Sequence, residues 1–151
     1  MKTNSWSEEE IAQLGRRIGA AVSGGEILEL IGDVGAGKTT LTRAIARGMG
    51  IEGPIQSPTF TISNRYETTD GLVLAHYDFY RLSEAGIMAE ELDEVLDDVK
   101  TVTVIEWADV VQNVLPSDRL SLFFETDSET SRKLVFKAGG VTSSRLLENI
   151  S

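Results

Sequence analysis

The sequence contains no cysteine among its 151 residues. This absence excludes a disulfide framework, a zinc site with cysteine ligands and a catalytic thiol nucleophile. It is also typical of proteins that work in a reducing cytoplasm, where disulfides do not persist. We therefore expect a cytoplasmic protein whose chemistry, if it has any, comes from other side chains.

Long apolar runs are missing as well. The first ten residues, MKTNSWSEEE, lack the apolar stretch that a secretory signal needs. No run approaches the about 20 apolar residues that span a bilayer. We therefore expect no association with a membrane.

Positive charge is scarce. The chain has 14 Lys and Arg against 24 Asp and Glu, which gives a formal net charge of −10. A surface this acidic repels phosphate backbones at long range. The charge therefore argues against independent binding of a nucleic acid.

The length and a hydrophobic content of 41% suit a single folded domain over residues 1–151. Helical spacing predicts helices between Ser7 and Gly24, between Thr39 and Gly50, and over residues 83–98, 108–115 and 141–150. Strands are expected over residues 26–31, 61–67, 71–78, 101–107, 118–125 and 131–138. This order predicts a three-layer α/β domain whose mixed sheet has a parallel centre and antiparallel edge strands.

The strongest motif is GDVGAGKT at residues 32–39, which satisfies the P-loop pattern G-x-x-x-x-G-K-S/T between a predicted strand and a predicted helix. Its glycines let backbone N–H groups turn inward around phosphates, and the helix amino terminus adds positive charge there. Lys38 can reach the β- and γ-phosphates, and the Thr39 hydroxyl is placed to bind Mg²⁺. The motif predicts a binding site for a nucleoside triphosphate.

Two acids follow predicted strands at the end where ligands bind in such sheets. Asp78 ends LVLAHYD and Glu106 follows TVTVI. Each is a candidate metal partner, and Glu106 is also a candidate for polarising the attacking water. The alternative for both is an ordinary solvated acid at a strand end.

Thr59, in QSPTF, is a candidate for a switch hydroxyl that senses the γ-phosphate or the metal. The alternative is a plain loop whose turn is set by Pro58. Trp107 either packs beside the nucleotide or anchors the helix that follows it. Residues 90–98 form an acidic helix face, which we interpret as solvated rather than as a docking surface.

The stretch HYDFYR at residues 76–81 holds the one histidine of the chain. Strand alternation places His76, Asp78 and Tyr80 on one face. A lone histidine without a nucleophile motif is more typical of a structural hydrogen-bonding role. Arg81 is the only basic residue in the stretch, so base stacking on its aromatics is not favoured. We expect Asp78 to be its functional centre and the aromatics to pack.

Taken together, GDVGAGKTT, SPTF, HYDFYRL and VIEW, in this order and spacing, resemble the bacterial TsaE family (older name YjeE) over about residues 7–132. The resemblance implies a P-loop NTPase fold and a small ATPase. It further implies support for the synthesis of threonylcarbamoyladenosine in tRNA, at the adenosine beside the anticodon. Family members act with the TsaD–TsaB pair, so tRNA would be reached indirectly through that complex.

The resemblance also implies site residues. Lys38 would be catalytic together with Asp78 and Glu106, and Thr39, Glu106 and Asp78 would be the Mg²⁺ ligands. Nucleotide contacts are implied for Ser7, Val34, Gly35, Ala36, Gly37, Lys38, Thr39, Thr40, Thr59, Trp107 and Arg132. The late hairpin of relatives often carries Gly-Arg, whereas here Ser131 precedes Arg132.

Other P-loop functions fit the sequence less well. A small-molecule kinase usually needs an arginine-bearing lid, and no Arg-rich insertion occurs. A GTPase needs an N/T-K-x-D tetrapeptide, which the sequence lacks. A non-catalytic nucleotide-binding module stays open if Asp78 and Glu106 are peripheral. Because no arginine stands out as an internal finger, we expect slow hydrolysis alone and stimulation by a partner.

Overall fold

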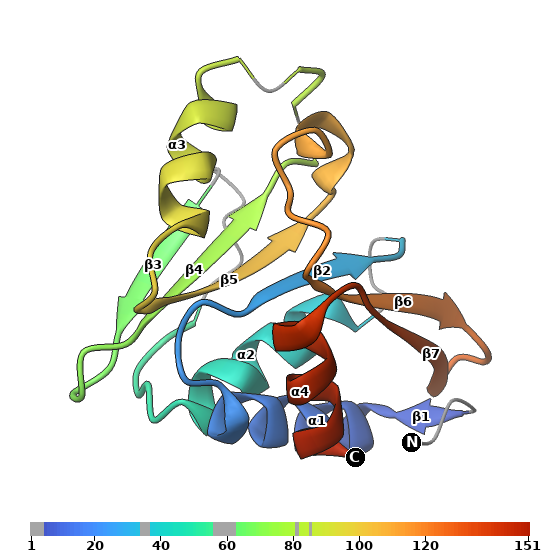
Figure 1. Cartoon of the computed structure of the whole chain (residues 1–151). Helices are drawn as coiled ribbons and strands as arrows, with labels where there is room; N and C mark the ends of the chain where they lie inside the picture. The colour runs from blue at the N-terminus through green and yellow to red at the C-terminus, as the bar shows by residue number, and fades with distance from the viewer. Residues whose placement is uncertain (1–4, 34–36, 56–62, 81, 85) are drawn as a thin grey trace.

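A computed structural model describes residues 5–33, 37–55, 63–80, 82–84 and 86–151. These residues form an α/β fold with a seven-stranded sheet in the order β1-β7-β6-β2-β5-β4-β3 (Figure 1). The strands are β1 (Trp6–Ser7), β2 (Ile27–Ile31), β3 (Ser63–Glu67), β4 (Val73–Asp78), β5 (Thr101–Glu106), β6 (Leu120–Thr126) and β7 (Ser131–Ala138).

The centre of the sheet is parallel. Strand β2 runs parallel to β5 and β6, and β4 runs parallel to β5. The outer pairs β3–β4, β6–β7 and β1–β7 are antiparallel. The predicted mixed sheet with a parallel centre and antiparallel edges is therefore confirmed.

Helices cover both faces of this sheet (Figure 1). They are α1 (Glu8–Ala21), α2 (Lys38–Gly48), α3 (Met88–Leu96), the 3₁₀ helix η1 (Ala108–Val111) and α4 (Val141–Ile150). Successive strand residues alternate between the faces. Leu28 and Val104 therefore pack with α1, α2 and α4, whereas Ile27 and Ile105 pack with α3 and η1.

Helices α1 and α2 pack at very short range through glycines. A Cβ atom on Gly19 would lie 2.2 Å from the Ile45 carbonyl oxygen, and one on Gly48 would lie 2.3 Å from the Arg16 carbonyl oxygen. Any larger side chain at these positions would force the helices apart. This contact sets the position of α2, which begins at the P-loop lysine Lys38.

The start of α1 agrees with its predicted capping box, but it carries an additional strand. Ser7 Oγ accepts from the Glu10 N–H at 3.1 Å, and Glu10 Oε1 accepts from the Ser7 N–H at 3.1 Å. Trp6 and Ser7 also pair with β7 as the edge strand β1, which the sequence reading missed. A two-residue strand has no periodicity by which it could be recognised.

Two predicted helices are shorter than expected. The helix predicted over residues 83–98 begins only at Met88, after Gly86, whose φ of +53° is left-handed. The segment predicted as a helix over residues 108–115 forms η1 for its first turn only. Both predictions were wrong at these ends because apolar spacing does not reveal where the backbone leaves the helical region.

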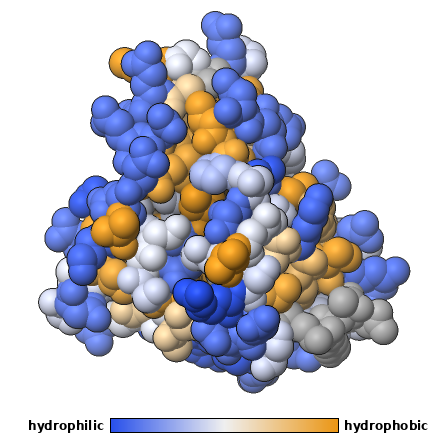
Figure 2. Space-filling model, viewed as in Figure 1, coloured by the Kyte–Doolittle hydropathy of each residue, from blue (hydrophilic) through white to orange (hydrophobic). Residues whose placement is uncertain are grey.

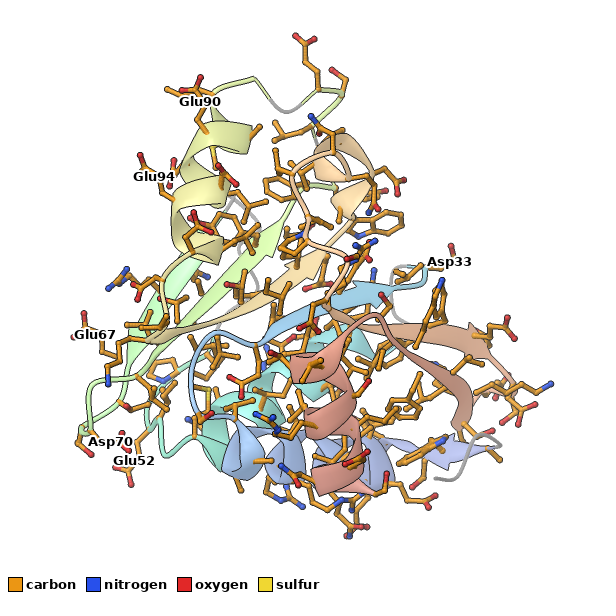
Figure 3. The ribbon with its side chains drawn as sticks, viewed as in Figure 1. Asp33, Glu52, Glu67, Asp70, Glu90 and Glu94 are labelled. Atoms are coloured by element: carbon orange, nitrogen blue, oxygen red, sulfur yellow. The ribbon has the colours of Figure 1, made fainter. Side chains whose placement is uncertain are left out.

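The acidic face of α3 is solvated, as the sequence reading favoured. Glu90 and Glu94 point away from the sheet (Figure 3). Hydrophilic residues cover this side of the molecule (Figure 2), while Leu92 and Leu96 are buried against the sheet. Within the described residues, no helix is both long and apolar enough to cross a membrane.

Candidate functional site

The site lies where the parallel strands β2, β4 and β5 end. Asp78 and Glu106 are the last residues of β4 and β5 and are register partners. Leu30, near the end of β2, is the register partner of Glu106 on its other side. The loop that contains the P-loop motif starts directly after β2, at Gly32. The topology thus brings both candidate acids to the edge from which the motif leaves the sheet.

Lys38 is the first residue of α2, and its side chain is only 4% exposed. Its Nζ donates to the Gly32 carbonyl oxygen at 2.7 Å and lies 3.8 Å from Glu106 Oε1. Its Nζ also lies 4.2 Å from the centroid of the Trp107 ring, a cation–π contact. The lysine is therefore held in place by contacts to the loop, to the acid and to the aromatic ring.

Opposing effects act on the pKa of Lys38. Burial lowers the pKa of this ammonium, because water no longer solvates it. The negative charges of Glu106, Asp78 and Asp33 oppose that shift. Asp33 lies beyond the end of β2 and is exposed (Figure 3). A bound anion would add to the opposing charges and favour the ammonium form.

Glu106 is 3% exposed, and its two carboxylate oxygens have different partners. Oε1 faces Lys38 Nζ, and Oε2 lies 2.5 Å from His76 Nε2. The sequence alone indicates no role for His76 beyond a structural hydrogen bond. The signal that could have found this pair is the alternation of β4, which puts His76 on the face of Asp78, next to Glu106 of the neighbouring strand.

Asp78 is half-buried at the end of β4, and its Oδ1 accepts from the Tyr80 N–H at 2.9 Å. Burial raises the pKa of Asp78, and the Tyr80 hydrogen bond opposes this rise. The Glu106 carboxylate raises the pKa further, since two nearby negative charges repel. A cation between the two acids would relieve that repulsion.

Trp107 follows β5 in a left-handed conformation, with φ of 54° and ψ of 51°. Few residues other than glycine adopt this conformation, and such strained residues cluster at functional sites. The Tyr80 ring lies 4.8 Å from the Trp107 ring and is 56% exposed. Tyr77 and Phe79 are instead buried and stack at 5.7 Å, so the prediction that the aromatics pack is confirmed for these two.

Ser7 and Arg132 come together at the opposite side of the sheet from β4 and β5. Ser7 pairs with Ser131, and Trp6 pairs with Arg132, in the β1–β7 ladder. Arg132 Nη1 donates to the carbonyl oxygens of Ser128 at 3.0 Å and Ser131 at 2.9 Å. The structure therefore places these two candidate nucleotide contacts as neighbours.

The remaining candidates belong to the P-loop motif and the segment after α2. Gly37 caps α2 with a φ of 105°, and Thr39 and Thr40 lie partly exposed in the first helical turn. A Cβ atom on Gly37 would lie 3.3 Å from Ile11 Cδ1, so glycine suits both the backbone and the space. The candidates Val34, Gly35, Ala36 and Thr59 lie outside the described residues.

The donor set fits magnesium bound together with a nucleotide. In the part of the chain that the structure describes, no group of three or more His, Asp or Glu side chains is arranged to hold a metal. Magnesium in phosphate sites needs only one or two protein ligands, because water and phosphate oxygens supply the rest. The Thr39 hydroxyl and the carboxylates of Glu106 and Asp78 are oxygen donors of the kind that Mg²⁺ prefers.

Known proteins place the chain in a family. Residues 5–134 match the family described as threonylcarbamoyl adenosine biosynthesis protein TsaE. The tRNA threonylcarbamoyladenosine biosynthesis protein TsaE of Bacillus subtilis (strain 168) is 35% identical over 158 aligned residues, covering 100% of this chain and 96% of the relative. The Streptomyces coelicolor protein of the same name is 40% identical over 111 residues, covering 73% of this chain and 75% of the relative.

A solved structure agrees with these matches. The crystal structure of Bacillus subtilis YdiB is similar with a TM-score of 0.77 and 30% sequence identity, covering 99% of this chain and 94% of that one. The likeness thus extends over nearly the whole fold as well as over the motifs. The matched segment, the full-length relatives and the shared fold together show that the chain belongs to the TsaE family.

Proposed function

We propose that this chain is a Mg²⁺-dependent ATPase, built as one P-loop NTPase domain over residues 1–151, that supports synthesis of threonylcarbamoyladenosine in tRNA. The relatives are named for biosynthesis of this modified nucleoside. The observation that carries the ATPase assignment is the buried contact of 3.8 Å between the P-loop lysine Lys38 and the strand-end acid Glu106. Both groups belong to the machinery that binds and cleaves a triphosphate.

Binding begins at the amino terminus of α2. Its free N–H groups and positive dipole end attract phosphates, and Lys38 adds a full charge at the same place. In the structure Lys38 Nζ is bonded to the Gly32 carbonyl at 2.7 Å. ATP would replace that carbonyl with phosphate oxygens, which are stronger acceptors because they are charged. Residues 34–37, Thr39 and Thr40 complete this phosphate-binding segment.

Around the phosphates, the other residues take separate roles. Thr39, Glu106 and Asp78 would hold Mg²⁺, which when bound neutralises charge that develops on the phosphates. Glu106 would also polarise the attacking water. Thr59 would act in a switch segment. Trp107 would lie beside the nucleotide, and Ser7 and Arg132 would contact its base side.

A partner is expected to complete the reaction. Two of the described arginines are engaged within the fold: Arg43 Nε donates to the Ile55 carbonyl at 3.1 Å, and Arg119 Nε pairs with Glu29 Oε1 at 2.8 Å. An arginine supplied by another protein accelerates related reactions by roughly 10³- to 10⁵-fold. We therefore propose that the chain binds the TsaD–TsaB complex and drives its turnover, with tRNA reached through that complex.

Steady-state ATP hydrolysis tests this proposal. We expect slow turnover by the chain alone and a rate at least about 100-fold higher with the TsaD–TsaB pair. Fast hydrolysis that the pair leaves unchanged would refute the dependence on a partner. Absence of ATP binding would refute the ATPase assignment itself.

Replacing the strand-end acid separates binding from hydrolysis. Glu106→Ala should lower the rate by about 100-fold or more, because a charged group at the reacting phosphate is lost. ATP should still bind, since Lys38 and the α2 amino terminus hold the phosphates. Asp78→Ala should also slow hydrolysis, and Glu94→Ala, on the exposed face of α3, should not. Wild-type turnover of Glu106→Ala would remove Glu106 from the site.

A further inference from the structure

We propose that His76 is a positioning residue, which holds the Glu106 carboxylate so that its second oxygen faces Lys38 and the phosphate site. This inference rests on the proposed ATPase function and deepens it. His76 would not touch the nucleotide and would act only through Glu106. Among the described residues, the hydrogen-bond partner that the structure gives this buried histidine is Glu106.

The register of the sheet creates the contact. His76 lies on β4 two residues before Asp78, and the Asp78 backbone pairs with Glu106 of β5. The imidazole therefore reaches the carboxylate across one strand spacing, with 2.5 Å between His76 Nε2 and Glu106 Oε2. Glu106 Oε1 lies on the other side, 3.8 Å from Lys38 Nζ. Two different partners, one for each oxygen, fix the rotation of the carboxylate plane.

Burial makes this restraint effective. His76 is 1% exposed and Glu106 is 3% exposed, so water cannot replace the imidazole as a partner. An ionised carboxylate in this environment needs hydrogen-bond donors to stay charged. Without His76, Oε2 would have to turn toward the remaining donor, Lys38, and Oε1 would leave the direction of the phosphates.

The histidine is suited to donate from Nε2. Its Nδ1 has no hydrogen-bond partner among the described residues. A tautomer with its hydrogen on Nε2 leaves no N–H unpaired at Nδ1 and gives Glu106 its donor. Ligating groups in metal sites are commonly oriented by such an outer partner, whose loss lowers metal affinity or activity about 10- to 100-fold.

The test compares two substitutions. His76→Leu fills the space without a donor, and His76→Gln keeps an amide N–H that can reach Glu106. With the TsaD–TsaB pair present, we expect His76→Leu to lower kcat about 10- to 100-fold and His76→Gln to retain most of the rate. Affinity for ATP without Mg²⁺ should stay at the wild-type value in both, because the lysine and α2 are intact. Thermal melting reports that each variant is folded.

A double-mutant cycle then tests whether His76 acts through Glu106. If His76 acts through Glu106, adding His76→Leu to Glu106→Gln should lower the rate no further. A folded His76→Leu with wild-type kcat, a folded His76→Gln as slow as His76→Leu, or an equal loss in the Glu106→Gln background would overturn the inference. If His76→Leu alone does not fold, the His76→Gln variant and the double variant decide in the same way, because the double variant contains no buried Glu106 carboxylate that would lose its donor.

Failure of the inference can be told apart from failure of the proposed function. Wild-type protein that neither binds nor hydrolyses ATP with the pair would refute the ATPase itself, before any variant is compared. An active wild type with an unaffected His76→Leu would refute only the positioning role.

Discussion

At the scale of single residues, the site is a chain of buried polar contacts from α2 to β4. Lys38, Glu106 and His76 follow one another, each in contact with the next. Removing one member takes a partner away from its buried neighbour, which is costly when that neighbour is charged. Substitutions here therefore affect stability and activity together, and their effects have to be separated by matched variants.

Another single residue, Asp118, provides a test of stability that is independent of the site. Its Oδ2 accepts from the Thr142 N–H at 3.0 Å, and its Oδ1 accepts from the Ser143 N–H at 2.9 Å, at the start of α4. Partial burial would raise the pKa of Asp118, but the hydrogen bond that the Ser143 hydroxyl donates to Oδ1 at 2.7 Å, together with these backbone bonds, outweighs burial and lowers the pKa below its ordinary value of 3.8. The ionised carboxylate therefore stabilises the fold.

We expect Asp118→Ala to lower the free energy of unfolding at pH 7 by about 1 kcal/mol, as for other helix caps. Since the folded pKa is depressed, the stabilisation is complete above 3.8 and is lost as the pH falls through the folded pKa. Urea unfolding of both proteins at pH 7 and in steps below that value measures the loss. The exposed Asp93→Ala is the control, and a difference that does not shrink with acid would contradict the assignment.

At the scale of elements, the α1–α2 contact sets the position of the amino-terminal end of α2, into which the P-loop motif leads. Glycine at positions 15, 19 and 48 lets the two helices touch through their backbones. Helix α1 also carries Ile11, against which Gly37 packs at the start of α2. The first helix thus supports the start of α2, where the P-loop motif ends.

Gly19→Ala should lower the free energy of unfolding by about 1–3 kcal/mol, because the added methyl group overlaps the Ile45 carbonyl. Intrinsic helix preference alone would have the opposite sign and favour alanine by about 0.5–1 kcal/mol. The control is Ala20→Gly at the exposed neighbouring position, whose free energy of unfolding should change only by the difference in helix preference. Chemical denaturation measures both, and a more stable Gly19→Ala protein would mean that the helices separate at little cost.

At the scale of the whole molecule, the candidate site draws on α2, β4 and β5, and its supporting contacts include α1. A ligand at this edge would therefore bind only the folded chain, because the unfolded chain does not bring these elements together. Binding that is restricted to the folded state raises stability by mass action. This coupling gives a test of nucleotide binding that does not depend on hydrolysis or on a partner.

We expect ATP with Mg²⁺ at about 100 times its Kd to stabilise the fold by about 2.7 kcal/mol, which thermal melting would show as a higher Tm. Lys38→Met should abolish most of this rise, because the buried ammonium is lost while an unbranched side chain of similar length still fills the space. The exposed Lys100→Met should keep the full rise. An unchanged rise in Lys38→Met would mean that the ligand binds elsewhere.

The sequence by itself determined the features that depend on short stretches of chain. The capping box of Ser7 and Glu10, the strand bounds of β7 and the full extent of α4 agree with the structure, because local periodicity and capping act within a few residues. The alternation of elements also determined the class of sheet. The P-loop pattern and the two strand-end acids could be recognised for the same reason, as each is defined by its immediate neighbours.

Only the tertiary structure decided which residues meet across strands. The edge strand β1, the left-handed Trp107 and the pairing of His76 with Glu106 all depend on contacts between distant segments. His76 and Glu106 lie 30 residues apart, and the sheet register that joins them comes from packing on both faces. The periodicity of the sequence predicts the face of the sheet on which a side chain lies. The register of the folded sheet determines which residue that side chain contacts.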